Sequence, residues 1–158
     1  MQKIEYGKAV SIHSASALDT EQIGKECAIS LLSKADAPRF VALYGDLGVG
    51  KTAFIRGFTS VISQNSKVKS PTFAIVHEYK GKPLSVFHFD MYRITDEDEL
   101  WSIGFYDYLD RSGICLVEWS ENIPFALPER YLRVEIIKDN ENDTDSRLIN
   151  LYPIGYSN

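Results

Sequence analysis

The fold of this chain is decided by one stretch of its sequence, Gly45-Asp46-Leu47-Gly48-Val49-Gly50-Lys51-Thr52. The stretch matches the pattern G-x-x-x-x-G-K-[ST], in which successive backbone N–H groups converge on one point and bind phosphate. Three of its residues are glycines, which leave the approach to the backbone open and tolerate positive φ angles. The pattern therefore predicts a phosphate-binding loop, provided that a strand precedes it and a helix follows it.

The residues on either side of the loop supply that context. Phe40–Tyr44 is a short apolar run that indicates a buried strand. In residues 52–62, Phe54, Phe58 and Ile62 are spaced four apart, which indicates a helix with one packed face. The N-terminus of such a helix directs free N–H groups and the positive end of its dipole at the loop, and both favour a bound anion.

Two further helical regions are predicted from capping signals. Asp19 is a good N-cap, and Gln22 stands three residues later, as in a capping box. Asp96 with Glu99 marks a second capped start. The apolar pattern of that second region is interrupted at Gly104, which indicates two short helices rather than one.

The remaining segments predict strands. Residues 73–79 and 84–90 are joined by so few residues that they must pair antiparallel, because a parallel crossover needs a dozen or more. Residues 114–118 are apolar up to the last one, which indicates a strand buried on both faces. Residues 131–137 and 148–152 are interpreted as a final hairpin. The order predicts an α/β fold with a mixed parallel and antiparallel sheet flanked by helices.

Length and composition agree with one P-loop domain over residues 1–158, with 44% hydrophobic and 25% charged residues. The net charge of −5 argues against a broad nucleic-acid footprint, which needs clustered Lys and Arg. Residues 1–10 lack the apolar core of a signal peptide, and no apolar run approaches a membrane span. Cys27 and Cys115 lie in apolar runs and are interpreted as buried thiols. These features predict a cytoplasmic protein with no membrane partner.

Four side chains provide candidate chemistry around the loop. Lys51 is expected to reach the β- and γ-phosphates, and the Thr52 hydroxyl is a candidate Mg²⁺ ligand. Asp90 and Glu118 each end an apolar strand, where a carboxylate can meet the ion. One could hold Mg²⁺ directly or through water while the other orients the attacking water as a base. The residues alone do not rank the two, and either could instead be a surface acid at a strand edge.

A stiff turn, Ser70-Pro71-Thr72-Phe73, precedes the next strand. The hydroxyl of Thr72 could sense the γ-phosphate, as switch segments do, or the turn could be a plain junction between loop and strand. Only one feature of the sequence bears on the identity of the nucleotide base, and it is a missing motif. The sequence has no Asn-Lys-x-Asp segment of the kind that guanine-specific P-loop proteins use, so ATP is favoured.

Two further residues have open interpretations. His88 alternates with Phe87 and Phe89, so it faces the opposite side of the strand and is interpreted as a hydrogen-bonded sheet histidine. Trp119 follows Glu118 and could either cover the nucleotide site or pack into the core.

Taken together, four motifs resemble those of the TsaE family, also called YjeE, over about residues 14–137. They occur in the order Gly-Asp-Leu-Gly-Val-Gly-Lys-Thr (45–52), Lys-Ser-Pro-Thr-Phe (69–73), His-Phe-Asp-Met-Tyr-Arg (88–93) and Val-Glu-Trp (117–119). The resemblance implies a small P-loop α/β domain without a lid and a slow ATPase. It implies TsaD and TsaB as partners, in the complex that transfers threonylcarbamoyl to adenosine 37 of tRNAs decoding ANN codons. The protein would support turnover of that complex and meet tRNA only through it.

The resemblance also implies roles for individual residues. Lys51 and Thr52 would bind phosphate and Mg²⁺, and Thr72 would belong to the switch-like segment. Asp90 would be the acid at a strand end, and Glu118 the Mg²⁺-linked acid. The catalytic set is thus expected to be Lys51, Thr72, Asp90 and Glu118, with Thr52, Glu118 and Asp90 around the metal.

The same resemblance implies that the start of the first helix, near Asp19, and the last strand, near Arg133, approach the nucleoside. Val49 departs from the family, where alanine is commoner. The expected nucleotide-binding set is Gly45, Asp46, Leu47, Gly48, Val49, Gly50, Lys51, Thr52, Asp19 and Arg133.

Two alternatives remain open. A small-molecule or nucleoside kinase would usually carry an Arg-rich lid, whereas the arginines here are scattered. A non-catalytic module would bind ATP only as a conformational ligand.

Overall fold

A mixed β-sheet forms the centre of the molecule. The computed structural model describes residues 8–71 and 75–156. Over these residues, seven strands form one sheet in the order β1-β7-β6-β2-β5-β4-β3. The strands are β1 (Val10–Ser14), β2 (Phe40–Tyr44), β3 (Val76–Tyr79), β4 (Ser85–Asp90), β5 (Gly113–Glu118), β6 (Tyr131–Lys138) and β7 (Arg147–Ile154). β2 runs parallel to β5 and β6, and β4 runs parallel to β5. The pairs β1–β7, β6–β7 and β3–β4 are antiparallel, which confirms the predicted mixed sheet.

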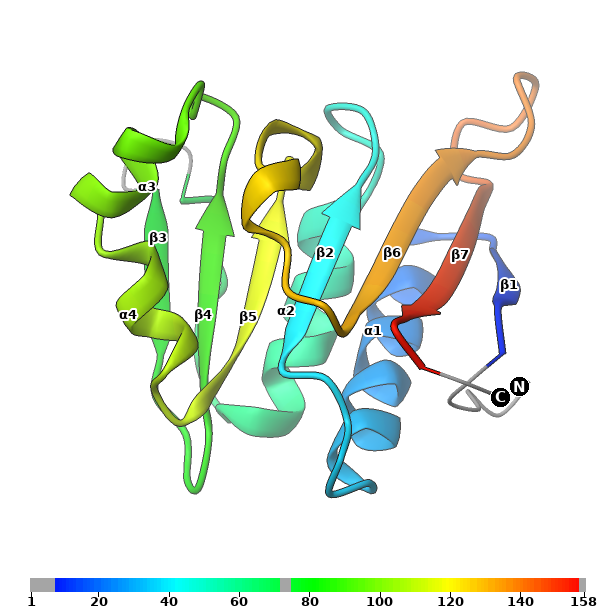
Figure 1. Cartoon of the computed structure of the whole chain (residues 1–158). Helices are drawn as coiled ribbons and strands as arrows, with labels where there is room; N and C mark the ends of the chain where they lie inside the picture. Colours follow the sequence, from blue (N-terminus) through cyan, green and yellow to red (C-terminus); the bar gives the residue numbers. More distant parts are fainter. Residues whose placement is uncertain (1–7, 72–74, 157–158) are drawn as a thin grey trace.

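Helices cover both faces of this sheet (Figure 1). The long helices α1 (Ala17–Leu32) and α2 (Lys51–Ile62) lie behind it in that view, and the short helices α3 (Glu97–Ser102) and α4 (Phe105–Leu109) lie in front. The 3₁₀ turns η1 (Ser120–Asn122) and η2 (Pro124–Ala126) follow β5. Each face has its own buried apolar cluster, one against α1 and α2 and one against α3, α4 and the 3₁₀ turns. The layers thus bury the sheet on both sides, as expected for an α/β fold.

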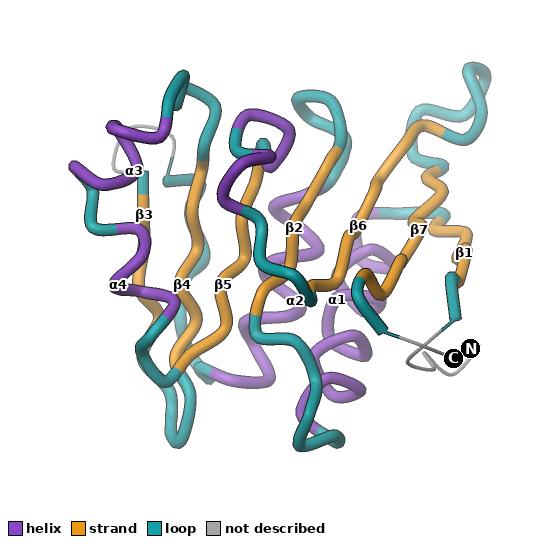
Figure 2. Tube along the Cα trace, in the orientation of Figure 1, coloured by secondary structure: helices purple, strands orange, loops and turns teal. Residues whose placement is uncertain are grey.

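The parallel strands bring three loops together at their carboxyl ends. The loops that follow β2, β4 and β5 lie at the same end of these strands (Figure 2). All six residues of β5 are buried, which confirms the prediction of a central strand. In open α/β sheets, ligands bind at the carboxyl ends of the strands, so this end of the sheet is where a site is expected.

The first helix begins earlier than its sequence indicated. Ser16 is the N-cap of α1, and its hydroxyl accepts a hydrogen bond from the backbone N–H of Asp19 at 3.1 Å. Asp19 lies in the first turn, and its carboxylate accepts from the N–H of Ala15 at 3.1 Å. The prediction of Asp19 as N-cap was therefore wrong. Ser16 and Asp19 have the spacing of a capping box themselves, and this pair satisfies two free N–H groups at once.

The second capping signal and the helix break were predicted correctly. The carboxylate of Asp96 accepts from the N–H of Glu99 at 3.0 Å and starts α3. Gly104 has a φ of 73° and separates α3 from α4. This left-handed conformation suits glycine, which has no Cβ.

Two differences concern strands. β1 was not predicted, because Val10 and Ile12 are its only large apolar residues and it is defined by pairing with β7. β3 spans Val76–Tyr79, and the first part of the strand predicted over residues 73–79 lies outside the described residues. The pairing of β3 with β4 is antiparallel, as predicted.

Both cysteines are free and buried, as predicted. Burial raises the pKa of Cys27 and of Cys115 to about 12, which keeps both thiols protonated. Over residues 8–71 and 75–156, no helix has the length and apolar content needed to cross a membrane.

The two long helices touch through glycines. A Cβ added at Gly24 of α1 would collide with the backbone carbonyl of Phe54, and one at Gly57 of α2 would collide with that of Glu21. Backbone atoms cannot move aside like flexible side chains. The close approach of α1 and α2 therefore depends on these two positions lacking side chains.

We expect Gly24→Ala to lower the free energy of unfolding by about 1–3 kcal/mol, as overpacking does. At an unconstrained helix position the same change would raise stability by about 1 kcal/mol, so the sign identifies the cause. Denaturant unfolding measures the effect. Lys25→Ala, at the exposed neighbouring position, is the control and should stay within about 0.5 kcal/mol of wild type. Equal or higher stability of Gly24→Ala would contradict the packing argument.

Candidate functional site

The loop between β2 and α2 has the backbone geometry that its glycines predicted. Gly45, Gly48 and Gly50 have φ angles of 150°, 75° and 118°. At Gly45 a Cβ would lie 2.6 Å from the carbonyl oxygen of Ile136, so no larger residue fits there. Gly50 is the N-cap of α2 and has no side chain to satisfy the N–H groups of the first turn. Those N–H groups are the donors that a phosphate requires.

The loop is anchored to the core and to β7 through Val49. Val49 is buried in the core, with 2% of its surface exposed, so its side chain lies away from the ligand side of the loop. Its N–H donates to the carbonyl of Asp46 at 3.2 Å. Its carbonyl accepts from Nε of Arg147, on β7, at 2.7 Å. The valine therefore fits the loop, and β7 contributes a contact that the sequence did not reveal.

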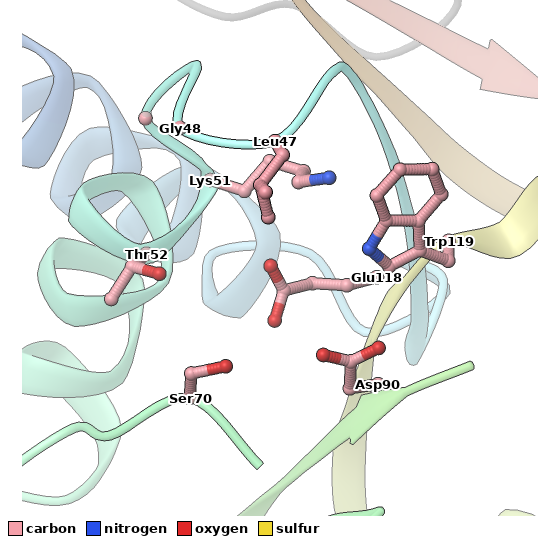
Figure 3. Close-up of a pocket in the computed structure, with 9 residues that line it drawn as sticks. Leu47, Gly48, Lys51, Thr52, Ser70, Asp90, Glu118 and Trp119 are labelled. Carbon is pink, nitrogen blue, oxygen red and sulfur yellow. The ribbon is translucent and has the colours of Figure 1, made fainter. Parts of the chain in front are cut away.

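A cavity of about 270 Å³ opens beside this loop (Figure 3). Its lining residues come from the loop, from the start of α2, from the segment before β3 and from the ends of β4 and β5. They are Leu47, Gly48, Gly50, Lys51, Thr52, Ser70, Asp90, Glu118 and Trp119.

The two predicted acids meet in this cavity because their strands are neighbours. In the parallel pair of β4 and β5, Asp90 lies opposite Glu118, and Glu118 also lies opposite Leu43 of β2. Only 7% of Asp90 and 5% of Glu118 is exposed. Figure 3 shows both carboxylates directed into the space that Thr52 and Ser70 border. Two buried carboxylates in one cavity argue against the reading of either as an ordinary surface acid.

Lys51 is held at the opposite side of the cavity. Its Nζ donates to the carbonyl of Gly45 at 2.5 Å and lies 4.2 Å from the ring centre of Trp119. Only 5% of the lysine is exposed. Contact with the face of an indole stabilises a cation, and more so when water is excluded.

Trp119 has a special backbone conformation. Its φ is 58° and its ψ 42°, a left-handed conformation that is uncommon for a bulky residue. The indole lines the cavity and also packs against the ring of Tyr92, with ring centres 4.9 Å apart. The indole therefore borders the cavity and is also partly buried against the apolar cluster on one face of the sheet. Backbone strain of this kind persists only where the surrounding structure fixes the residue, and residues strained in this way tend to cluster at functional sites.

His88 makes the contact with Glu118 that sequence reasoning missed. Its Nε2 lies 2.7 Å from Oε2 of Glu118, and the imidazole is fully buried. The prediction of a hydrogen-bonded sheet histidine is confirmed, but the partner was not identified. The period-2 pattern places His88 and Asp90 on one face of β4, and the pairing of Asp90 with Glu118 would have pointed to the contact.

Asp19 and Arg133, predicted near the nucleoside, are not among the residues that line the cavity. The carboxylate of Asp19 bonds Ala15, although the start of α1 lies beside the loop: a Cβ on Gly50 would be 3.8 Å from the methyl of Thr20. Arg133 stacks its guanidinium 4.0 Å over the ring of Tyr44, the residue before the loop. Both therefore lie near the loop but outside the cavity.

The remaining predicted residues have varied positions. Gly45 and Asp46 belong to the loop without lining the cavity. Thr72 lies outside the described residues, whereas Ser70 of the same turn lines the cavity.

The oxygen donors fit a magnesium ion. Mg²⁺ prefers hard oxygen ligands, uses one or two carboxylates, and completes its coordination with water and substrate phosphate. The hydroxyl of Thr52 and the carboxylates of Asp90 and Glu118 provide such a set in one cavity. These residues would hold the ion between the start of α2 and the ends of β4 and β5.

The mixed sheet, the glycine-rich loop and the helix that follows it define the class of protein, an α/β domain of the P-loop type. The family model described as "Threonylcarbamoyl adenosine biosynthesis protein TsaE" matches residues 14–149. The chain belongs to the TsaE family, as its motifs predicted.

Individual relatives agree with this assignment. The tRNA threonylcarbamoyladenosine biosynthesis protein TsaE of Haemophilus influenzae is 40% identical over 117 residues, which cover 73% of this chain and 73% of that protein. The protein of the same name from Rickettsia bellii is 32% identical over 141 residues, covering 89% and 95%. Among solved structures, Bacillus subtilis YdiB superposes with a TM-score of 0.74 at 29% identity. The match covers 94% of this chain and 87% of that one.

Proposed function

We propose that this protein binds ATP with Mg²⁺ and hydrolyses it slowly, in support of the threonylcarbamoyl modification of adenosine 37 in tRNAs that decode ANN codons. Its partners in this proposal are TsaD and TsaB, and it meets tRNA only through their complex, in the cytoplasm. The observation that carries the proposal is the convergence of Lys51, Thr52, Asp90 and Glu118 on one cavity beside the glycine-rich loop.

Phosphate binding would rest on the loop and on Lys51. The N–H groups of the loop and of the first turn of α2 provide directed donors, and the helix dipole adds to them. At about 4 Å and an effective dielectric near 20, the lysine and one phosphate charge attract by about 4 kcal/mol before desolvation. The amine now donates to Gly45 and contacts Trp119, so phosphate would compete with the carbonyl for its protons.

The acids would divide the remaining work. When bound, Mg²⁺ neutralises charge that develops on the phosphates. Thr52 and one acid would hold it, while the other acid would orient the water that attacks the γ-phosphate. The neighbouring positions of Asp90 and Glu118 at the ends of β4 and β5 suit such a division.

The test is to measure ATP hydrolysis by the purified protein alone, and then with the TsaD–TsaB complex and tRNA. We expect slow release of phosphate from the protein alone and faster release with the complex. A rate that the complex does not change would contradict the partnership. Rapid transfer of phosphate to a nucleoside or small alcohol would instead identify a kinase.

A further inference from the structure

His88 is a polar residue in an otherwise apolar part of β4. The imidazole is fully buried, and its neighbours along the strand, Phe87 and Phe89, belong to the core. Nε2 lies 2.7 Å from Oε2 of Glu118. An ionised carboxylate has acceptor atoms only, so Nε2 carries the proton and donates it to this bond.

The other nitrogen of the ring has no such contact. Nδ1 is buried and has no hydrogen-bond partner among the described residues. Most buried polar atoms in proteins are paired, so an unpaired one calls for an explanation. Leucine would fill this position in a strand without leaving a buried polar atom unpaired. The stability of the core therefore does not account for a histidine here, whereas its contact with Glu118 does.

The contact restrains a flexible side chain. Glutamate has three rotatable bonds, and fixing such a side chain costs conformational entropy. His88 is fully buried on β4, which pairs with a strand on each side, and it lies on the same face of the sheet as Glu118. A donor fixed in this way holds one carboxylate oxygen, while the carboxylate as a whole still lines the cavity (Figure 3).

We infer that His88 is a positioning residue for hydrolysis: its Nε2–H holds the carboxylate of Glu118 in the orientation that the reaction needs. The inference rests on the proposed function, because it assigns His88 to the same site. His88 is not among the residues that line the cavity, so it acts through Glu118 and not on the nucleotide.

Two substitutions of similar polarity test this role. Glutamine can place its amide nitrogen near the position of Nε2, whereas asparagine reaches only the position of Nδ1. We expect His88→Asn to lower kcat for ATP by about 10–100-fold, the effect of losing a partner that orients a site residue. His88→Gln should stay within about 3-fold of wild type, and the Kd for ATP with Mg²⁺ should change by less than about 3-fold in both, on the same reasoning. His13→Asn, the same change at an exposed histidine of β1, is the control.

A double-mutant cycle separates positioning from general damage. In a Glu118→Gln background the reacting carboxylate is already lost, so adding His88→Asn should lower kcat little further. The inference would be overturned if His88→Asn lowered kcat by the same factor in the wild-type and the Glu118→Gln proteins. Equal activity of His88→Asn and wild type would also overturn it. So would a fall in nucleotide affinity that accounts for the lost activity. If the wild-type protein with its partners hydrolyses no ATP, the proposed function itself fails.

A spectroscopic measurement does not depend on activity. The chain has three histidines, so ¹⁵N-labelled imidazole N–H groups are readily assigned by NMR. We expect one slowly exchanging, downfield Nε2–H resonance that disappears in His88→Gln and moves upfield in Glu118→Gln, because an amide is a weaker acceptor than a carboxylate. A wild-type spectrum without this resonance would also overturn the inference.

Discussion

Replacing Lys51 with alanine is expected to lower ATP hydrolysis by at least about 100-fold, because a cation directed at the transferring phosphate stabilises the charge of the transition state. Affinity for ATP with Mg²⁺ should also fall, since the lysine contacts the phosphates before the reaction as well. The amine is buried and supplied by the first residue of α2, and among the described residues that line the cavity Lys51 is the one lysine. Phosphate release and calorimetric titration with ATP measure the two effects.

The control for this variant is Lys25→Ala, which removes an exposed lysine from α1 and should leave both quantities unchanged. Lys51→Ala also loses a hydrogen bond to Gly45 and a contact with Trp119, so its thermal unfolding should be measured beside wild type. If folded Lys51→Ala protein binds ATP with Mg²⁺ as tightly as wild type, the assignment of the loop as a nucleotide site is wrong.

The second large effect is expected from Glu118→Gln. Glutamine keeps the size of the side chain and can still accept the hydrogen bond of His88, so the change removes mainly the charge and the basicity. We expect kcat to fall by about 10²–10⁴-fold, the usual contribution of a group that handles a proton or a metal in the transition state. Nucleotide binding should be retained within about 10-fold, because the loop and Lys51 provide most of the phosphate contacts.

Glu121→Gln, an exposed acid in η1 close to the site, is the matched control and should hydrolyse ATP like wild type. Asp90→Asn should be measured in the same assay over a range of Mg²⁺ concentrations. If replacing one acid raises the Mg²⁺ concentration needed for ATP hydrolysis, that acid is the metal ligand. If replacing the other lowers the rate even at saturating Mg²⁺, that acid orients the water. Full activity of Glu118→Gln would exclude Glu118 from both roles and leave the ATPase proposal without its central acid.

Features with a local cause could be read from the sequence. The loop of residues 45–52 was recognised because glycine is needed for positive φ angles, and those angles are present. The helix start at Asp96 and the break at Gly104 also depend on neighbouring residues only. The start of α1 was misplaced because Ser16 and Asp19 are both good N-caps, and the choice depends on which N–H group each one reaches.

The ends of β4 and β5 show which features could not be predicted from neighbouring residues alone. Asp90 and Glu118 were selected because each follows an apolar run, but only the parallel pairing of β4 with β5 makes them neighbours. The contact of His88 with Glu118 and that of Arg147 with Val49 join residues 30 and 98 positions apart. Such contacts depend on strand order and register, which apolar periodicity does not specify.

The amino-acid sequence by itself determined the class of fold, the glycine-rich loop between β2 and α2 and the TsaE family, because these depend on short motifs and on residue periodicity. Only the tertiary structure decided which side chains share the cavity. It included Ser70 and Trp119 in the lining, left Asp19 and Arg133 outside it, and joined His88 to the acid of β5. The physical reason is that a site is a convergence of distant segments, and the packing of sheet and helices sets that convergence.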